Sequence, residues 1–225
     1  MFANSSPVSS RQTVPHPRLP AIVGRHLESA WRRPASAAGR GAVDALLTRI
    51  PATARLVLDA GCGTGESAFA LARGDPACFV IGVDKSAARL AVGQRVADAG
   101  AAPPNVVLLR CDLADFWPLA VAAGMRFERQ FLLYPNPWPK PDHVRRRWHA
   151  HPVLPAMLAL GGAIELRTNW RVYADEFIGA LGQCGWSGEC QAWTAQPTLS
   201  PFERKYAASG HALWRCRMVR VTAAA

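Results

Sequence analysis

Short apolar runs alternate with segments of helical periodicity along most of this 225-residue chain. The expected strands are residues 56–58, 79–83, 106–109, 131–134 and 164–166, with a late strand within 212–221. The expected helices are residues 42–50, 67–73, 86–99, 155–160 and 172–181, with Ser86 placed as an N-cap. Strands that alternate with helices at this spacing predict an α/β fold with a Rossmann-like, doubly wound, mostly parallel sheet.

The chain is strongly basic. It has 26 Lys and Arg against 16 Asp and Glu, a net charge of +10, which favours a polyanionic partner. Its six cysteines show no metal-ligand spacing, so we expect reduced thiols, no metal site and a cytoplasmic protein. The chain has no run of about 18 apolar residues, so we expect no membrane association, and we favour a monomer.

The first 40 residues differ in composition from the rest. They hold six arginines, one acid and five prolines, a composition that buries little apolar surface. We therefore predict a flexible basic arm over 1–40, with a short helical turn at about 25–33, and a single domain over 41–225. An organellar transit peptide is the alternative for the arm, but its dense prolines disfavour the amphipathic helix of such peptides.

A glycine-rich loop follows the first expected strand. Its sequence runs from Asp59 through Gly61, Gly63 and Gly65 into a helix, and lacks the Lys-Ser/Thr pair of a P-loop. Such glycines let the backbone turn tightly beside a ligand. The alternative is a tight turn with a purely structural role, which has the same sequence pattern. Asp84 ends the second strand, where it can accept from both ribose hydroxyls, and Asp112 follows the third, placed either for an adenine amine or as a helix N-cap.

A second ligand site is predicted where the fourth strand ends. The apolar run 131–134 stops at four alternating prolines, and the residues between and after them include Asn136, Trp138, Lys140 and three consecutive arginines. Ligands in open α/β sheets bind at the carboxyl ends of strands, so this loop is a candidate substrate site. The alternative is a proline-rich surface loop with a solvated charge run.

Three segments, LDAGCGTGES, VIGVD and NVVLLRCDL, resemble the class I S-adenosylmethionine-dependent methyltransferases. This resemblance implies S-adenosylmethionine as the cofactor. Asp59 and Gly61 would hold its methionine part, in the loop that also includes the cofactor-binding positions Gly63 and Gly65. Asp84 would hold its ribose and Asp112 its adenine.

The second half resembles the tRNA (guanine-N7)-methyltransferase family, which acts at tRNA position 46. The segments YPNPWPKPDHVRRRW, LALGGAIELRTNWRVYADEF and SPFERKYAASGHALWR carry the resemblance, which covers about residues 56–217. It implies that Asn136 occupies the catalytic position, which also contacts the cofactor. The substrate positions that it implies are Lys140, Asn169, Ser200, Pro201, Phe202 and Glu203.

Three positions depart from the family pattern: Asn136 and Asn169 replace aspartates, and Ser200 replaces a threonine. Guanine N7 carries a lone pair and needs no deprotonation, so Asn136 can still accept from N1–H and donate to O6. It cannot counter the charge that develops on the base, and Glu203 is then the nearest carboxylate by family position. Trp138 either stacks on a base or wedges the loop against the core.

Two other functions remain open. Asn136-Pro137-Trp138-Pro139 is a distorted version of the motif of amino-methyltransferases that act on adenine N6 or cytosine N4. The chain could also be an RNA-binding paralogue whose active site has decayed. If the partner is RNA, phosphates near the target base are expected to contact Lys140, Arg145, Arg146 and Arg147. The arginines of the arm would bind a more distant stretch of the same RNA. The alternative is that both groups of charges form a solvated surface.

Overall fold

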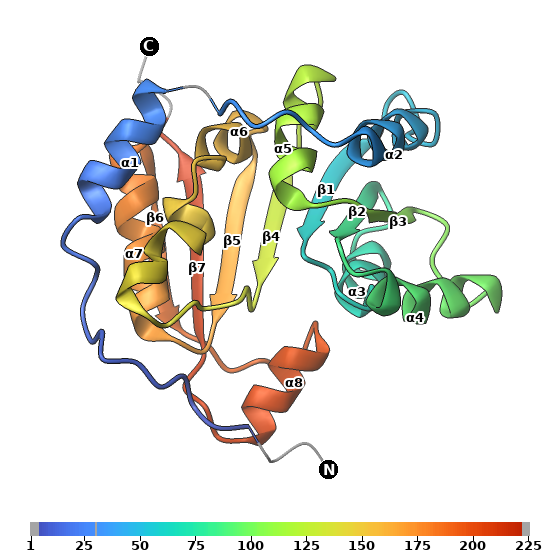
Figure 1. Ribbon diagram of the computed structural model, residues 1–225. Helices are drawn as coiled ribbons and strands as arrows, with labels where there is room; N and C mark the ends of the chain where they lie inside the picture. The colour runs from blue at the N-terminus through green and yellow to red at the C-terminus, as the bar shows by residue number, and fades with distance from the viewer. Residues whose placement is uncertain (1–4, 30, 222–225) are drawn as a thin grey trace. The chain divides into compact units, whose positions relative to one another are not determined.

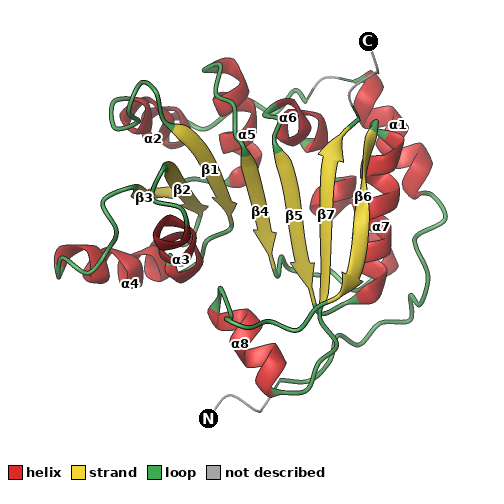
Figure 2. Cartoon of the chain, turned by 180° about the vertical axis from the view of Figure 1, so that it is seen from behind, coloured by secondary structure: helices red, strands yellow, loops and turns green. Residues whose placement is uncertain are grey.

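The computed structural model describes residues 5–29 and 31–221. The chain forms two compact units. One unit comprises residues 33–133 and 159–162. It is called the N-loop unit because it contains the glycine-rich loop after the first strand. The other comprises residues 1–32, 134–158 and 163–225 and is called the substrate unit because it contains the loop predicted as a candidate substrate site. Figures 1 and 2 show the helices and strands of both from opposite sides.

The N-loop unit is built on four parallel strands in the order β3-β2-β1-β4. These strands are β1 (Arg55–Ala60), β2 (Cys78–Asp84), β3 (Val106–Arg110) and β4 (Arg129–Leu133). The helices of this unit are α2 (Ala37–Leu47), α3 (Glu66–Gly74), α4 (Ala87–Asp98) and α5 (Leu113–Ala122). Five of the six residues of β1 are buried, as expected for a central parallel strand.

The substrate unit contains three antiparallel strands in the order β5-β7-β6, namely β5 (Ala163–Thr168), β7 (Trp214–Arg220) and β6 (Trp186–Ala192). Its helices are α1 (Leu19–Glu28), α6 (Leu154–Ala159), α7 (Arg171–Gln183) and α8 (Pro201–Ala208), with short 3-10 helices η1 (Pro141–Arg146) and η2 (Trp148–Ala150). Helix α7 packs on β5, β6 and β7, and α1 packs along α7 (Figure 1).

The predicted alternation of strands and helices is confirmed, as is the cap: Ser86 Oγ accepts from the N–H of Arg89 at the start of α4. The sequence reading missed α5, β6 and α8. Helix α5 contains Pro118, which is typical of a helix break, and β6 contains Gly188 and only one buried residue, Trp186, so it lacks the alternation of a half-buried strand.

The predicted arm includes residues 1–4 and Ala30, which lie outside the described residues, and the predicted domain includes residues 222–225, which do as well. The division into arm and domain stays a prediction. Within the arm, the helix lies at α1 rather than at about residues 25–33, and Leu19, Ile22 and Val23 on it are buried.

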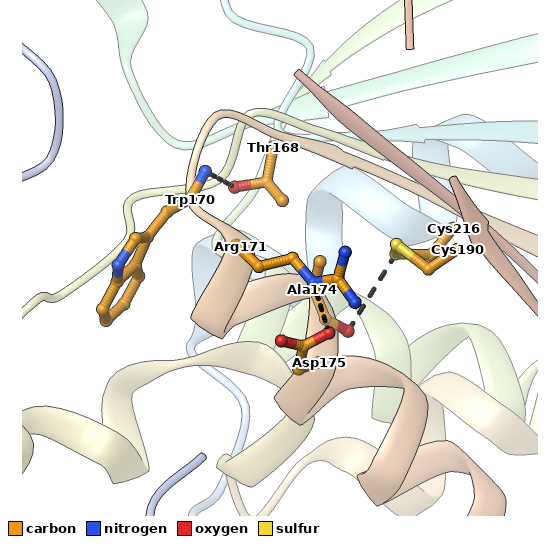
Figure 3. Close-up of a disulfide and its surroundings, with 7 residues drawn as sticks. All are labelled: Thr168, Trp170, Arg171, Ala174, Asp175, Cys190 and Cys216. Atoms are coloured by element: carbon orange, nitrogen blue, oxygen red, sulfur yellow. Dashed lines mark hydrogen bonds and ion pairs between the residues drawn. A yellow bond between two sulfur atoms is a disulfide. The ribbon is translucent and has the colours of Figure 1, made fainter. Parts of the chain in front are cut away.

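Two cysteines differ from the expectation of reduced thiols. Cys190 on β6 and Cys216 on β7 are direct cross-strand partners and form a disulfide (Figure 3). The same close-up shows Asp175 paired with Arg171 on α7, and Trp170 just before that helix. The antiparallel register, which the sequence did not reveal, brings these two cysteines together.

Cysteines 62, 78, 111 and 184 are free. Across residues 5–29 and 31–221, the structure contains no helix with the length and apolarity needed to cross a membrane.

Candidate active site

The glycine-rich loop of the N-loop unit contacts the carboxylate of Asp84 through Gly63. Gly63 donates its N–H to Asp84 Oδ2 at 3.0 Å, and Ser86 donates its N–H to Oδ1 at 2.7 Å. Gly61 and Gly65 have φ of +87° and +82°, in the left-handed region that favours glycine. The prediction that the loop and Asp84 meet at one edge of the sheet is therefore confirmed.

Asp59 lies at the end of β1 and is 1% exposed. Its Oδ2 accepts a hydrogen bond from Ser67 at 2.5 Å, whereas Oδ1 is buried and has no hydrogen-bond partner among the described residues. Burial raises the pKa of Asp59 to about 7, with a smaller contribution from repulsion by Asp84, while the bond from Ser67 lowers it. An unsatisfied buried carboxylate oxygen fits a ligand that brings a cationic donor, such as an amino acid ammonium.

Asp112 is half-buried and caps α5. Its Oδ1 accepts from the N–H of Ala114 at 2.9 Å, so the N-cap alternative is confirmed. The cap uses one oxygen, which leaves the other side of the carboxylate as the part that could accept from an adenine amine.

In the substrate unit, the proline-rich loop has an unusual backbone. Tyr134 and Trp138 have φ of 53° and 46°, values that few residues other than glycine adopt. Asn136 is exposed, and its Oδ1 accepts from the N–H of Trp138 at 3.3 Å. The Trp138 ring contacts two residues of η1: the Arg146 guanidinium lies 4.8 Å from its ring centroid, and the His143 ring packs edge-on against it.

The three arginines of the charge run divide into two kinds. Arg145 and Arg146 on η1 are exposed, as is Lys140 before it. Arg147 is fully buried and donates to Glu176 Oε2 at 2.6 Å, and to the carbonyl oxygen of Trp138 at 3.0 Å. The prediction that Arg147 contacts phosphates is wrong, because its buried guanidinium is bound to Glu176 and to the Trp138 carbonyl oxygen inside the substrate unit.

Asn169 follows β5 and is half-buried. Its Nδ2 lies 3.0 Å from His211 Nδ1, and His211 Nε2 lies 2.8 Å from the carbonyl oxygen of Ser5. Donation from Asn169 and to Ser5 places the ring proton of His211 on Nε2. The amide oxygen of Asn169 is the group left to accept from a ligand.

The segment Ser200–Glu203 is a helix start. Ser200 is 5% exposed and its hydroxyl accepts from the N–H of Glu203, the geometry of an N-cap on α8. Glu203 is fully buried, and its carboxylate accepts from Arg167, Tyr134, Trp193 and the N–H of Leu199. The expectation that Glu203 offers a carboxylate to the substrate is therefore corrected.

Of this segment, Phe202 is the exposed member at 41%, and it stacks on Tyr206 at 6.1 Å between ring centroids. Tyr206 in turn stacks on His211 at 5.1 Å. The signal for the helix start was in the sequence, since Ser followed three residues later by Glu is the capping-box pattern. No sequence signal pointed to Ser67, Glu176 or His211, whose roles depend on partners far away along the chain.

A family model described as "Putative methyltransferase" matches residues 53–216 of this chain. Curated relatives named tRNA (guanine-N(7)-)-methyltransferase include one from Anaeromyxobacter dehalogenans, 34% identical over 74% of this chain and 86% of the relative. One from Leifsonia xyli is 33% identical over 62% of this chain and 60% of its own, and one from Chromohalobacter salexigens is 28% identical over 91% and 86%.

Solved methyltransferases have a similar structure. The 16S rRNA methyltransferase KamB covers 84% of this chain and 96% of its own, with a TM-score of 0.58 and 18% identity. A mutant 16S rRNA (adenine(1408)-N(1))-methyltransferase from Catenulisporales acidiphilia, determined with its cosubstrate SAM, covers 92% and 93%, with a TM-score of 0.56 and 20% identity. These likenesses confirm the predicted Rossmann-like α/β fold.

Proposed function

Because the chain belongs to the tRNA (guanine-N7)-methyltransferase family and is an S-adenosylmethionine-dependent methyltransferase, we propose that it forms 7-methylguanosine in tRNA, at position 46 by family resemblance. The observation that carries the proposal is the match of residues 53–216 to the methyltransferase family model, together with relatives that bear this one name. The proposal concerns the target atom and the RNA, since the cofactor and the enzyme class follow from the family.

S-adenosylmethionine supplies an electrophilic methyl group when bound. Asp59 fits its methionine ammonium, because Oδ1 is a buried acceptor that lacks a partner among the described residues. Gly61, Gly63 and Gly65 form the backbone cradle, and Asp84 would accept from the ribose hydroxyls with the lone pairs that Gly63 and Ser86 leave over. Asp112 would accept from the adenine amine.

The substrate residues orient the base rather than deprotonate it. Guanine N7 has an in-plane lone pair, so the site has to aim that lone pair at the methyl group. Asn136 is exposed on the loop, where its amide can donate to guanine O6 and accept from N1–H. Asn169 would add a further acceptor through its amide oxygen, because its Nδ2 is engaged with His211.

Electrostatic help at the base is weak in this chain. A positive charge develops on guanine during methylation, and a nearby carboxylate would stabilise it. Asn136 and Asn169 carry no charge, and the carboxylate of Glu203 is neutralised by Arg167 at 2.9 Å. We therefore expect catalysis to depend mainly on positioning.

Exposed cations and an aromatic ring would hold the RNA. Lys140, Arg145 and Arg146 are exposed around η1 and suit phosphates. Phe202 presents its ring on α8 beside Pro201 and suits contact with a base. We further propose that the protein acts as a monomer in the cytoplasm, where tRNA is its partner.

One assay tests the proposed function. The protein is incubated with methyl-labelled S-adenosylmethionine and unmodified bulk tRNA, and the modified nucleoside is identified by mass spectrometry. We expect 7-methylguanosine. An N6-methyladenosine or N4-methylcytidine product would instead support the amino-methyltransferase reading of Asn136-Pro137-Trp138-Pro139, and RNA binding without any product would support a decayed paralogue.

A further inference from the structure

The loop of residues 135–140 needs support from outside itself. Tyr134 before it and Trp138 within it both have positive φ, and such backbone persists only where the surrounding structure holds it. Four prolines at alternate positions from 135 to 141 remove the N–H groups with which a loop would otherwise bond to its neighbours. The conformation of the loop must therefore be fixed largely through its carbonyl oxygens.

Arg147 provides one such bond. Its Nη2 and Nε donate to the Trp138 carbonyl oxygen at 3.0 and 3.3 Å, and its guanidinium lies over the Trp170 ring at 4.8 Å. Ser10 provides another, since its hydroxyl donates to the carbonyl oxygen of Pro139 at 2.5 Å. The second donor belongs to the N-terminal segment, 129 residues away along the chain.

Arg147 is held in turn by Glu176 of α7, which is fully buried. Oε2 of Glu176 accepts from Arg147 at 2.6 Å and from His149 Nε2 at 2.9 Å, and Oε1 accepts from Gln12 Nε2 at 2.7 Å and from the N–H of His16 at 2.9 Å. Burial alone would raise the pKa of Glu176, but the bonds and charges of His149 and Arg147 lower it to about 2. Glu176 is thus a buried, ionised carboxylate that accepts from four donors.

Gln12 closes the cluster. While its Nε2 donates to Glu176, its Oε1 accepts from Arg147 Nη2 at 2.9 Å, so one amide bridges both members of the buried ion pair. The side chains of Arg147, His149 and Glu176 are fully buried, whereas that of Gln12 is half-buried. Gln12 lies two residues from Ser10. The N-terminal segment therefore binds both the loop and the pair that holds the loop.

We propose that Gln12 is a positioning residue for methyl transfer: through Arg147 and Glu176 it fixes the loop that carries Asn136 and Lys140. This inference rests on the proposed function of that loop. It gives the N-terminal segment a task in the chemical step, beyond that of a basic arm that grips distant RNA.

Gln12→Ala removes the bridge and leaves the Arg147–Glu176 pair in place, and Thr13→Ala, at an exposed neighbouring position, is the matched control. We expect kcat with tRNA to fall roughly 10- to 100-fold in Gln12→Ala, with KM for tRNA within about threefold, because misplacement of a reacting group lowers the rate of the chemical step. Thr13→Ala should match the wild type. Cofactor affinity, measured by calorimetry, should be unchanged in both variants.

Hydrogen exchange of the peptide that covers residues 134–147, measured without RNA or cofactor, gives a readout independent of activity. We expect faster exchange at Trp138 and Lys140 in Gln12→Ala only. A kcat within about threefold of wild type, a rise in KM alone, or unchanged exchange would each overturn the proposal. If the wild-type protein itself makes no 7-methylguanosine, the proposed function fails, and the exchange comparison still decides whether Gln12 fixes the loop.

Discussion

The hydroxyl of Ser200 accepts a hydrogen bond from the backbone N–H of Glu203 at 3.1 Å, and this bond starts helix α8. The Glu203 carboxylate turns back to accept from the N–H of Leu199 at 2.6 Å. Serine and glutamate thus satisfy donors at the helix start in a reciprocal arrangement close to a capping box. In the segment Ser200–Glu203, the side chains of Ser200 and Glu203 are buried, and the helix that they start carries the exposed ring of Phe202.

The first prediction follows from this cap. Ser200→Ala should lower the free energy of unfolding by about 1 kcal/mol, because the N–H of Glu203 loses its acceptor. Urea denaturation measures the change. Ser200→Thr is the control and should stay near wild type, since its hydroxyl can form the same bond. A loss of tRNA affinity in Ser200→Ala with no loss of stability would show that the hydroxyl serves the substrate instead.

Cofactor affinity should depend on the ionisation of Asp59, whose pKa burial raises to about 7. Only the ionised carboxylate pairs with the methionine ammonium, so the affinity should weaken by up to about tenfold per pH unit as the pH falls below 7. Calorimetry from about pH 5 to pH 7 measures this slope. Asp59→Asn should bind weakly and without the slope, and a slope that persists in that variant would assign it to another group.

The same carboxyl affects stability with the opposite sign when no cofactor is bound. Its pKa in the folded protein lies above the ordinary value of 3.8, so the protonated form favours folding. This contribution is complete below about pH 4 and is lost as the pH rises to about 7. Asp59→Asn should remove this part of the pH dependence of unfolding.

Asp84→Ala should weaken S-adenosylmethionine binding by roughly 10- to 150-fold, equivalent to about 1.5–3 kcal/mol, through loss of a charged acceptor for the ribose. The substitution also frees the N–H groups of Gly63 and Ser86, which loosens the loop. Calorimetry checks it, with Arg89→Gln as the control, because Arg89 is exposed and 3.9 Å from Asp84 Oδ2. Unchanged affinity in Asp84→Ala would remove Asp84 from the site.

Replacement of Arg145 and Arg146 by alanine should weaken tRNA binding and flatten the plot of log affinity against log salt by about 1.4–1.8, the release of two phosphate contacts. Arg147→Ala should behave differently. It leaves the buried Glu176 carboxylate without the charge of Arg147 and should cost about 3–5 kcal/mol of stability. Salt titrations and urea denaturation separate the two effects, and a stable Arg147→Ala with a reduced salt slope would contradict the burial of this side chain.

Asn136→Asp tests the identity of the target atom. A carboxylate at this position would stabilise the charge on guanine, so the rate of 7-methylguanosine formation should rise or hold. Asn136→Ala is the control and should lose rate, because it removes the amide contacts with the base. If the product is methylated on an exocyclic amine, the aspartate has no such charge to stabilise, and no gain in rate is expected. Single-turnover assays with nucleoside mass spectrometry distinguish these outcomes.

The sequence by itself determined the α/β alternation, the glycine-rich loop with Asp84 beside it, and the Ser86 cap. These features depend on local periodicity and on residues that follow strand ends, which carry their meaning wherever the strands pair. It also indicated the loop after β4, because four alternating prolines cannot continue a ladder.

Only the tertiary structure decided which charged residues are available. Arg145, Arg146 and Arg147 are identical in sequence terms, yet the third is buried because Glu176, Gln12 and the Trp138 carbonyl oxygen meet it. The Glu203 carboxylate is likewise buried in an ion pair with Arg167, 36 residues away along the chain. A charge can be buried only where its partners are assembled, and those partners come from distant parts of the chain, which local sequence patterns do not encode.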